Sequence, residues 1–163
     1  MYSFLLNLAL CISTKTHPQL VCGITAPYKG PVIFTVHVVL NTGRINRVVE
    51  RQSGSIFFTG ATASLRGGSG FAAFASAKFA LRALSQSMAR ELGPQGIHVA
   101  HFIIDGAIDT AFIKETFPDT YALKEKDGIL SPESIADSYW FVHSQHRSAW
   151  THELDLRPYM EKF

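Results

Sequence analysis

The chain alternates short apolar runs with longer amphipathic stretches, a pattern typical of an α/β protein. Residues 55–59 (SIFFT) form a β-branched and aromatic run between two glycines, which predicts a strand buried on both faces. Residues 70–92 are rich in Ala, Leu, Met, Arg and Glu and end at Gly93-Pro94, which predicts a helix with its stop signal. Residues 97–104 (IHVAHFII) predict a second strand. A strand, a helix and a strand with short connections favour a parallel sheet with a right-handed crossover.

The predicted helix over residues 70–92 is apolar around much of its circumference. Its apolar arc contains Phe71, Phe74, Ala75, Leu81, Leu84, Met88 and Leu92. A helix of this kind is covered on more than one side. We expect one side to pack on the sheet and another to pack against a neighbouring helix or a second subunit, as in a homo-oligomer formed through this helix. The alternative is a central helix buried within one subunit.

Further elements are predicted on both sides of this unit. Residues 131–134 (SPES) predict the start of a helix, because proline suits the first helical position and an acidic residue suits the positive end of the helix dipole. Residues 31–40 predict an early strand that ends at a turn. Residues 44–52 are expected to form the tail of a helix.

Phe74 and Lys78 lie one helical turn apart, so their side chains share a face of the predicted helix. With the strand and turn before them, they form a segment (residues 54–78, GSIFFTGATASLRGGSGFAAFASAK) that resembles the catalytic half of a short-chain dehydrogenase/reductase. The resemblance implies a partial Rossmann-like, doubly wound parallel sheet, the C-terminal half of that family's α/β fold. It also implies that Lys78 binds the ribose hydroxyls of a nicotinamide cofactor, while Phe74 occupies the position of the catalytic tyrosine.

The two positions that carry proton transfer in the family differ here. Family members place a serine before the tyrosine, and counting back from Phe74 by the family's spacing leads to Ala61. Phenylalanine has no proton to give, and loss of a general acid typically lowers the rate by roughly 10²–10⁴-fold. Thr62 and Ser64 carry nearby hydroxyls, and either could replace the serine if the turn has a different orientation. The alternative is that both bond their own backbone in the turn.

The segment after the second predicted strand resembles the family's loop that holds the nicotinamide carboxamide. Gly106, Ile108 and Thr110 match that loop in type and spacing, whereas Asp105 replaces its proline. The resemblance therefore implies that these three residues, together with Lys78, bind NAD or NADP. It also implies a small-molecule carbonyl or alcohol as the substrate.

The glycine-rich phosphate fingerprint of the family is not found before residue 54. Its glycines let the backbone and a helix N-terminus approach the pyrophosphate. Residues 59–66 (TGATASLR) begin like it but carry Ser64 and Arg66 where glycine is required, and residues 68–73 (GSGFAA) lie too far from the strand. We therefore divide the chain into an atypical N-terminal segment, residues 1–46, and a C-terminal part of a short-chain dehydrogenase/reductase domain, residues 47–163. We expect a truncated domain.

Composition argues against several classes of function. The net charge is +2 with interspersed charges, and no basic stripe with interleaved aromatics occurs, so we expect no nucleic-acid partner. The apolar run at residues 4–12, interrupted by Asn7, is too short to span a membrane and lacks the basic flank of a signal peptide. Cys11 and Cys22 have no metal-binding spacing, so we expect reduced thiols in a cytoplasmic protein.

Four histidines are candidates for metal binding. His143 and His146 lie at the end of a predicted helix and could chelate, whereas His98 and His101 lie on opposite faces of a predicted strand. The spacing places no third ligand, so we expect no metal site.

The resemblance implies an NAD(P)-dependent oxidoreductase, and the lost groups indicate a truncated and catalytically degenerate one, a pseudoenzyme. Its catalytic positions are Lys78, Phe74 in place of the tyrosine and Ala61 in place of the serine. The alternative is an inactive interaction module that dimerises through the helix at residues 70–92, or a non-functional fragment of a gene of this family.

Overall fold

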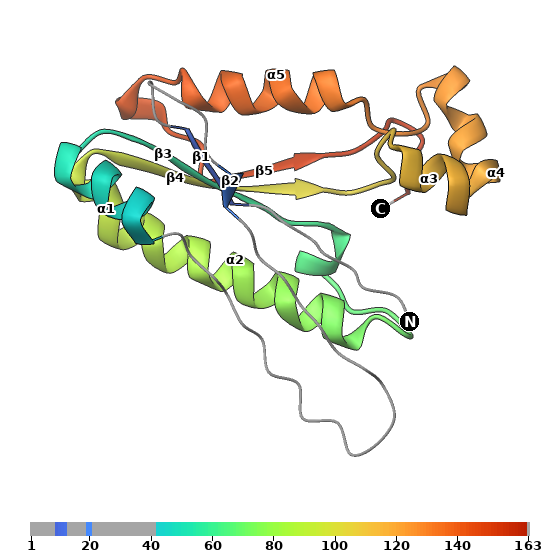
Figure 1. Ribbon diagram of the computed structural model, residues 1–163, viewed down its shortest axis with the longest axis horizontal. Helices are drawn as coiled ribbons and strands as arrows, with labels where there is room; N and C mark the ends of the chain where they lie inside the picture. Colours follow the sequence, from blue (N-terminus) through green and yellow to red (C-terminus); the bar gives the residue numbers. More distant parts are fainter. Residues whose placement is uncertain (1–8, 13–18, 21–41, 163) are drawn as a thin grey trace, which may run out of the picture.

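The computed structural model describes residues 9–12, 19–20 and 42–162, which form an α/β structure (Figure 1). The strands are β1 (Ala9–Ile12), β2 (Gln19–Leu20), β3 (Gly54–Thr59), β4 (Ile97–Ile104) and β5 (Glu153–Leu156). The α-helices are α1 (Thr42–Arg51), α2 (Ala72–Leu92), α3 (Ala111–Thr116), α4 (Pro118–Tyr121) and α5 (Pro132–His143). Short 3-10 helices lie at Thr62–Ser64, Gly93–Gln95, Ala122–Lys126 and Arg147–Ala149. The strand predicted at residues 31–40 lies outside the described residues.

The five strands form one mixed sheet in the order β2-β1-β3-β4-β5. β3, β4 and β5 are parallel, with Phe57 opposite Ala100 and Phe102 opposite Leu154 in the register. β1 runs antiparallel to both β2 and β3. The predicted unit of strand, helix and strand is therefore confirmed, and an antiparallel pair continues the parallel part of the sheet at one edge.

Helices cover both faces of the sheet, as in a doubly wound fold (Figure 1). On the face covered by α1 and α2, Phe58 is buried in a core with Val48 and Leu81. On the face covered by α5, Phe57 is buried in a second core with Tyr139. Because neighbouring residues of β3 enter different cores, its central residues 56–58 are all apolar.

α2 buries one side and exposes the other. Its buried residues are Ala75, Ala77, Lys78, Leu81, Ser85 and Met88. On the opposite side Phe79 keeps 43 % of its surface exposed, and Phe71, just before the helix, keeps 60 %. One side thus packs on the sheet as expected, and a helix buried all round within one subunit is not what the structure shows. Packing of the exposed side against a second subunit stays a prediction.

Local sequence signals set the ends of the elements. α5 begins at Pro132, and the hydroxyl of Ser131 accepts a hydrogen bond from the Ser134 amide, which confirms the predicted helix start. After α2 the chain turns at Gly96 with a φ of +82°, and a Cβ there would lie 2.8 Å from the carbonyl oxygen of Gln52. Glycine is therefore needed at this turn, which leads the chain into β4 beside β3.

The helix predicted at residues 44–52 is confirmed as α1, which begins slightly earlier, at Thr42. α2, with 21 residues, is the longest of the described helices. Among the helices in the described ranges, none has the length and apolar character needed to cross a membrane.

Candidate functional site

The carboxyl ends of β3, β4 and β5 lie at one edge of the sheet, here called the carboxyl edge, and open α/β sheets bind their ligands at such an edge. β3 leads into the turn of residues 60–64, and β4 leads into the loop of residues 105–110. The amide of Gly60 donates a hydrogen bond to the carbonyl of Phe102 over 2.6 Å, so the turn lies against the end of β4. The carboxyl edge therefore brings together the segments that carry the predicted site residues.

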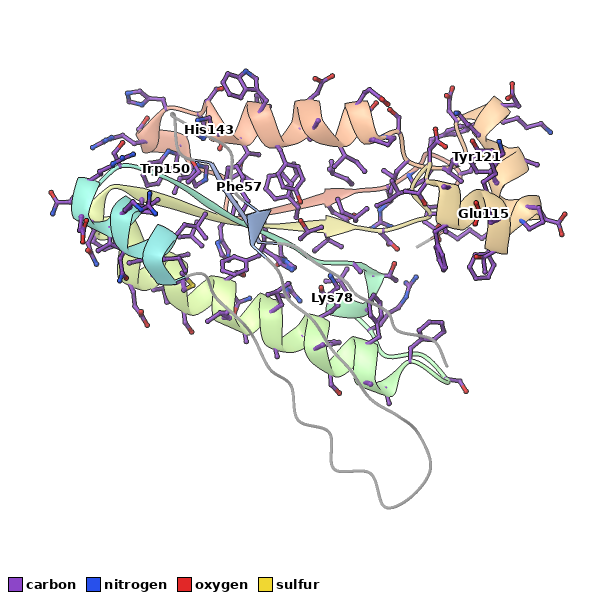
Figure 2. All side chains as sticks on the ribbon, in the orientation of Figure 1. Phe57, Lys78, Glu115, Tyr121, His143 and Trp150 are labelled. Atoms are coloured by element: carbon purple, nitrogen blue, oxygen red, sulfur yellow. The ribbon has the colours of Figure 1, made fainter. Side chains whose placement is uncertain are left out.

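Lys78 projects from α2 toward the sheet (Figure 2). Its amine donates a hydrogen bond over 2.8 Å to the carbonyl oxygen of Thr59, the last residue of β3. Lys78 is 5 % exposed, and its amine lies 5.8 Å from the centre of the Phe74 ring. The two side chains therefore meet on one face of α2, as predicted, and the buried ammonium has a carbonyl and an aromatic ring as partners.

The turn after β3 places its hydroxyls in different environments. The amide of Ala61 donates a hydrogen bond to the Ser64 hydroxyl over 3.2 Å, and Ser64 is fully buried. The Thr62 hydroxyl instead donates to the carboxylate of Asp105. Ser64 is thus engaged with the turn backbone, as its alternative interpretation predicts, whereas Thr62 joins the turn to the loop after β4.

Asp105 anchors the start of that loop. It is 3 % exposed, and its two carboxylate oxygens have different partners. One accepts the hydrogen bond from Thr62, and the other lies 3.4 Å from the guanidinium of Arg157. A carboxylate held by a hydroxyl and a cation can be buried, because its charge is paired and one of its oxygens is hydrogen-bonded. Replacement of the proline by Asp105 therefore gives this chain a polar tie that proline could not make.

The loop of residues 105–110 is itself tightly held. Gly106 has a φ of +149°, and a Cβ there would lie 2.8 Å from Cδ of Pro158, so glycine is required. Ile108 forms an isolated parallel bridge with the segment before α5. The Thr110 hydroxyl accepts a hydrogen bond from the Ile113 amide over 3.3 Å, which caps α3. That hydroxyl has a hydrogen of its own to donate.

A family model described as short chain dehydrogenase matches residues 30–120, more than half of the chain. The chain belongs to the short-chain dehydrogenase family. It is 32 % identical over 95 residues to the 3-dehydrosphinganine reductase of Danio rerio and 31 % identical over 90 residues to the 3-ketodihydrosphingosine reductase of Bos taurus. These matches cover 56 % and 53 % of this chain but 29 % and 27 % of the relatives. The chain therefore spans less than a third of the length of these curated relatives.

Solved structures of short-chain dehydrogenases share the fold. One from Rhodopseudomonas palustris is 48 % identical, with a TM-score of 0.54, and the match covers 72 % of this chain and 44 % of that chain. The closed form of serine dehydrogenase, complexed with NADP+, is 21 % identical with a TM-score of 0.63, and the match covers 75 % and 51 %. The α/β fold expected from the sequence is thereby confirmed.

Behind the turn, the chain has an ionic network that the sequence analysis missed. His101, fully buried on β4, donates its Nδ1 hydrogen to the carboxylate of Glu153 over 3.0 Å. Arg82 of α2 donates two hydrogen bonds to the same carboxylate, over 2.7 and 2.6 Å. Burial lowers the pKa of His101, so the ring is neutral near pH 7 and its Nε2 carries no hydrogen. The network depends on the strand register that sets His101 opposite Glu153, and the sequence carries no local signal for that register.

Gly60 packs directly against this network. A Cβ at Gly60 would lie 2.4 Å from Nε2 of His101 and 2.6 Å from the hydroxyl oxygen of Ser64. Glycine at this position therefore serves the close packing of the turn against β4. This supports the interpretation of residues 59–66 as the connection to α2 and not as a phosphate fingerprint.

Thr59 is held from both helical layers. Its carbonyl accepts the hydrogen bond from Lys78 on α2, and its hydroxyl is hydrogen-bonded to the phenol of Tyr139 on α5. Burial raises the pKa of Tyr139 to about 12. A phenol that is buried on the α5 face and is so weakly acidic cannot take the place of a catalytic tyrosine at position 74.

The histidines are engaged in other contacts. His143 is hydrogen-bonded to Ser55 over 2.9 Å, and His146 is hydrogen-bonded to Ser148 over 2.7 Å. His98 lies on the α5 face and His101 on the α2 face, so their predicted placement on opposite faces is confirmed. Within residues 9–12, 19–20 and 42–162, no group of three or more His, Cys, Asp or Glu side chains could hold a metal ion.

Proposed function

We propose that residues 47–163 are the C-terminal part of an NAD(P)-dependent oxidoreductase that acts on a small carbonyl or alcohol. The observation that carries this proposal is the buried amine of Lys78 at the carboxyl edge of the sheet, 2.8 Å from the end of β3. Names of related proteins support it. The two curated relatives are called reductases, and solved neighbours are described as complexed with NADP+ or with NADH.

The donor groups at the carboxyl edge fit the nicotinamide half of such a cofactor. An ammonium group is a hydrogen-bond donor only, so Lys78 suits the oxygens of ribose hydroxyls. Gly106, Ile108 and Thr110 lie in the tightly held loop after β4, and they would hold the carboxamide with backbone groups and the Thr110 hydroxyl. When bound, the nicotinamide supplies or accepts the hydride, and the chain's own residues have to bind, orient and exchange the proton.

We propose that this chain has lost the side chains that exchange a proton with the substrate. Phe74 and Ala61 offer no proton. The Thr62 hydroxyl gives its hydrogen to Asp105, so it can accept a hydrogen bond from a substrate alcohol but cannot act as the acid for a carbonyl. Loss of the general acid lowers the expected rate of carbonyl reduction by roughly 10²–10⁴-fold, while binding of the cofactor is unaffected by this loss.

Titration of the purified chain with NADPH tests the proposal. Energy transfer from protein aromatic groups to the bound dihydronicotinamide should change the fluorescence in a saturable way. Titration with sodium chloride to the same ionic strength serves as the control. A fluorescence signal that stays linear in the NADPH concentration would contradict cofactor binding and with it the oxidoreductase.

A second candidate function, an interaction module that dimerises through α2, is favoured by one observation. Phe79 exposes 43 % of its surface on the side of α2 that faces away from the sheet, and Phe71, just before the helix, exposes 60 %. Burial of such rings against a second copy would stabilise a dimer. Light scattering on the eluting protein should then show a dimer, and Phe79→Glu should convert it to a monomer. A monomeric wild-type chain would rule out this function.

A further inference from the structure

A pocket lies at the opposite edge of the sheet from Lys78, where β3 and β4 begin. This amino-edge pocket has a volume of about 560 Å³ and is lined by the end of α1, the starts of the two strands and the segment after α5. Figure 2 shows two of its lining residues, His143 and Trp150, at the end of the molecule away from Glu115 and Tyr121. Its size falls within the range of about 300–1,000 Å³ that is common for ligand sites.

The lining of the pocket is basic. It contains Arg51, His98, His143, His146 and Arg147, and no Asp or Glu. Arg51 ends α1 and His143 ends α5, and basic groups at these positions offset the negative ends of the helix dipoles. Arg147 lies beyond the end of α5 in a short 3-10 helix, so its charge is not needed for that purpose. The pocket therefore attracts an anion.

The segment that carries Arg147 is held in a fixed position. Gln145 and Thr151 exchange two hydrogen bonds of 2.8 Å across its base. The Ser148 amide donates to Nδ1 of His146 over 3.3 Å, so in the neutral ring of His146 the hydrogen lies on Nε2. Arg147 and His146 thus bring N–H donors to the pocket from a well-anchored segment, and such donors favour an oxyanion.

His98 forms part of the pocket wall. Its ring stacks on Trp150 with the ring centres 4.7 Å apart, and its Nε2 donates to the carbonyl of Thr151 over 2.8 Å. Burial lowers the pKa of His98, so the ring is neutral and Nδ1 holds a lone pair. In the described part of the chain, this buried Nδ1 has no hydrogen-bond partner. Because no water-sized atom can touch this nitrogen, His98 is an uncharged part of the pocket wall and makes no hydrogen bond to a ligand.

We propose that the amino-edge pocket binds a small phosphorylated molecule. Its phosphate oxygens accept hydrogen bonds from the guanidinium of Arg147 and from Nε2–H of His146. A phosphate group suits these neighbouring donors better than a single carboxylate, because it offers them more oxygens. The site is separate from the proposed cofactor site and does not depend on the proposed function.

Nuclear magnetic resonance of the ¹⁵N-labelled full chain tests this site, with inorganic phosphate and glycerol phosphate as probes. Both should shift the indole N–H signal of Trp150 and the imidazole signals of His146 in a saturable way, whereas sodium chloride of equal ionic strength should not. Arg147→Gln should weaken the binding at least tenfold, and His146→Gln should weaken it as well. Arg90→Gln is the matched control, because Arg90 is exposed on α2 and bonds the carbonyl of Gln86 in its own helix.

Three results would overturn the site. Shifts that stay linear in the phosphate concentration, or equal affinity in the Arg147→Gln and Arg90→Gln variants with dispersed spectra, would indicate an adventitious ion only. If NADPH and phosphate compete for the pocket, as followed by the Trp150 signal, the pocket binds a phosphate of the cofactor. That result would contradict a site separate from the cofactor site. Saturable phosphate binding in a chain that does not bind NADPH would support this pocket while the proposed oxidoreductase function fails.

Discussion

The amine of Lys78 and the carbonyl oxygen of Thr59 are joined by a hydrogen bond of 2.8 Å that links α2 to the end of β3. The lysine at the carboxyl edge is therefore held by a backbone group that does not require a tyrosine one turn before it. This explains how the chain can keep its lysine buried beside Phe74, where family members have a tyrosine. The groups proposed for cofactor binding and for proton transfer are thus separable in this protein.

Lys78→Met should weaken cofactor binding without unfolding the chain. Replacing a buried charged group by an apolar one of similar volume is often neutral or stabilising, while the Thr59 carbonyl left without its donor costs stability. Because these effects oppose each other, the free energy of unfolding should change by less than about 2 kcal/mol. NADPH affinity, measured by fluorescence, should fall at least tenfold. Lys126→Met, at an exposed position, is the control. Equal NADPH affinity in the two variants would show that Lys78 does not take part in cofactor binding.

Restoring both proton-transfer groups should raise activity. The double variant Phe74→Tyr with Ala61→Ser should reduce a panel of small aldehydes and ketones with NADPH by roughly 10²-fold or more above the wild-type rate, since a general acid contributes that much. Phe79→Tyr is the matched control, because it adds the same phenol on the exposed side of the same helix. A double variant that binds NADPH but is no faster than this control would show that Phe74 and Ala61 do not occupy catalytic positions.

Gly60→Ala should destabilise the fold, whereas Gly67→Ala should not. A Cβ at Gly60 would lie 2.4 Å from Nε2 of the fully buried His101, while a Cβ at Gly67 meets nothing within 4 Å. Overpacking of this kind costs about 1–3 kcal/mol, and a Gly to Ala change at an open position is neutral or slightly stabilising. Urea unfolding of the two variants measures the difference. Equal unfolding midpoints would mean that the turn and the ionic network do not pack as described.

Stability should fall in mild acid because of two buried histidines. Burial is the largest cause that lowers the pKa of both His98 and His101 below the ordinary value of 6.5. In the unfolded chain these rings take up protons near pH 6.5, whereas in the folded chain they do so only at lower pH. The unfolded state therefore binds more protons in this window, and the free energy of unfolding decreases as the pH falls below about 6.5.

This decrease should level off below the folded-state pKa values, and neither ring should contribute a slope above about pH 7.5. Urea unfolding at several pH values below about 7.5 measures this decrease in the free energy of unfolding. His101→Gln removes one of the two titrating groups, so the slope of unfolding free energy against pH should become smaller. A slope that is the same in this variant and in the wild type would exclude His101 as a source of the acid sensitivity.

The elements that the sequence predicts well are those fixed by local signals. α2 ends where Gly93-Pro94 stops it, α5 begins at its Ser131 cap, and β4 has the bounds of its apolar run. The meeting of Phe74 and Lys78 was predictable for the same reason, because helical geometry alone brings residues four apart onto one face.

Contacts between distant segments were not predictable in this way. The hydrogen bond between Thr62 and Asp105 and the binding of Glu153 by Arg82 join residues far apart in the chain. Each depends on strand register and on the placement of a helix over the sheet, which no short sequence window specifies. The antiparallel pairing of β1 with β3 is likewise a property of the assembled sheet.

That pairing limits what can lie beside β3. A strand has two hydrogen-bonding sides, and β3 uses one for β4 and the other for β1, with Ala9 opposite Phe58. A further parallel strand could join the sheet next to β3 only by displacing β1. A strand from another nucleotide-binding half, in this chain or in another molecule, would therefore compete with β1 for one row of backbone amides and carbonyls on β3.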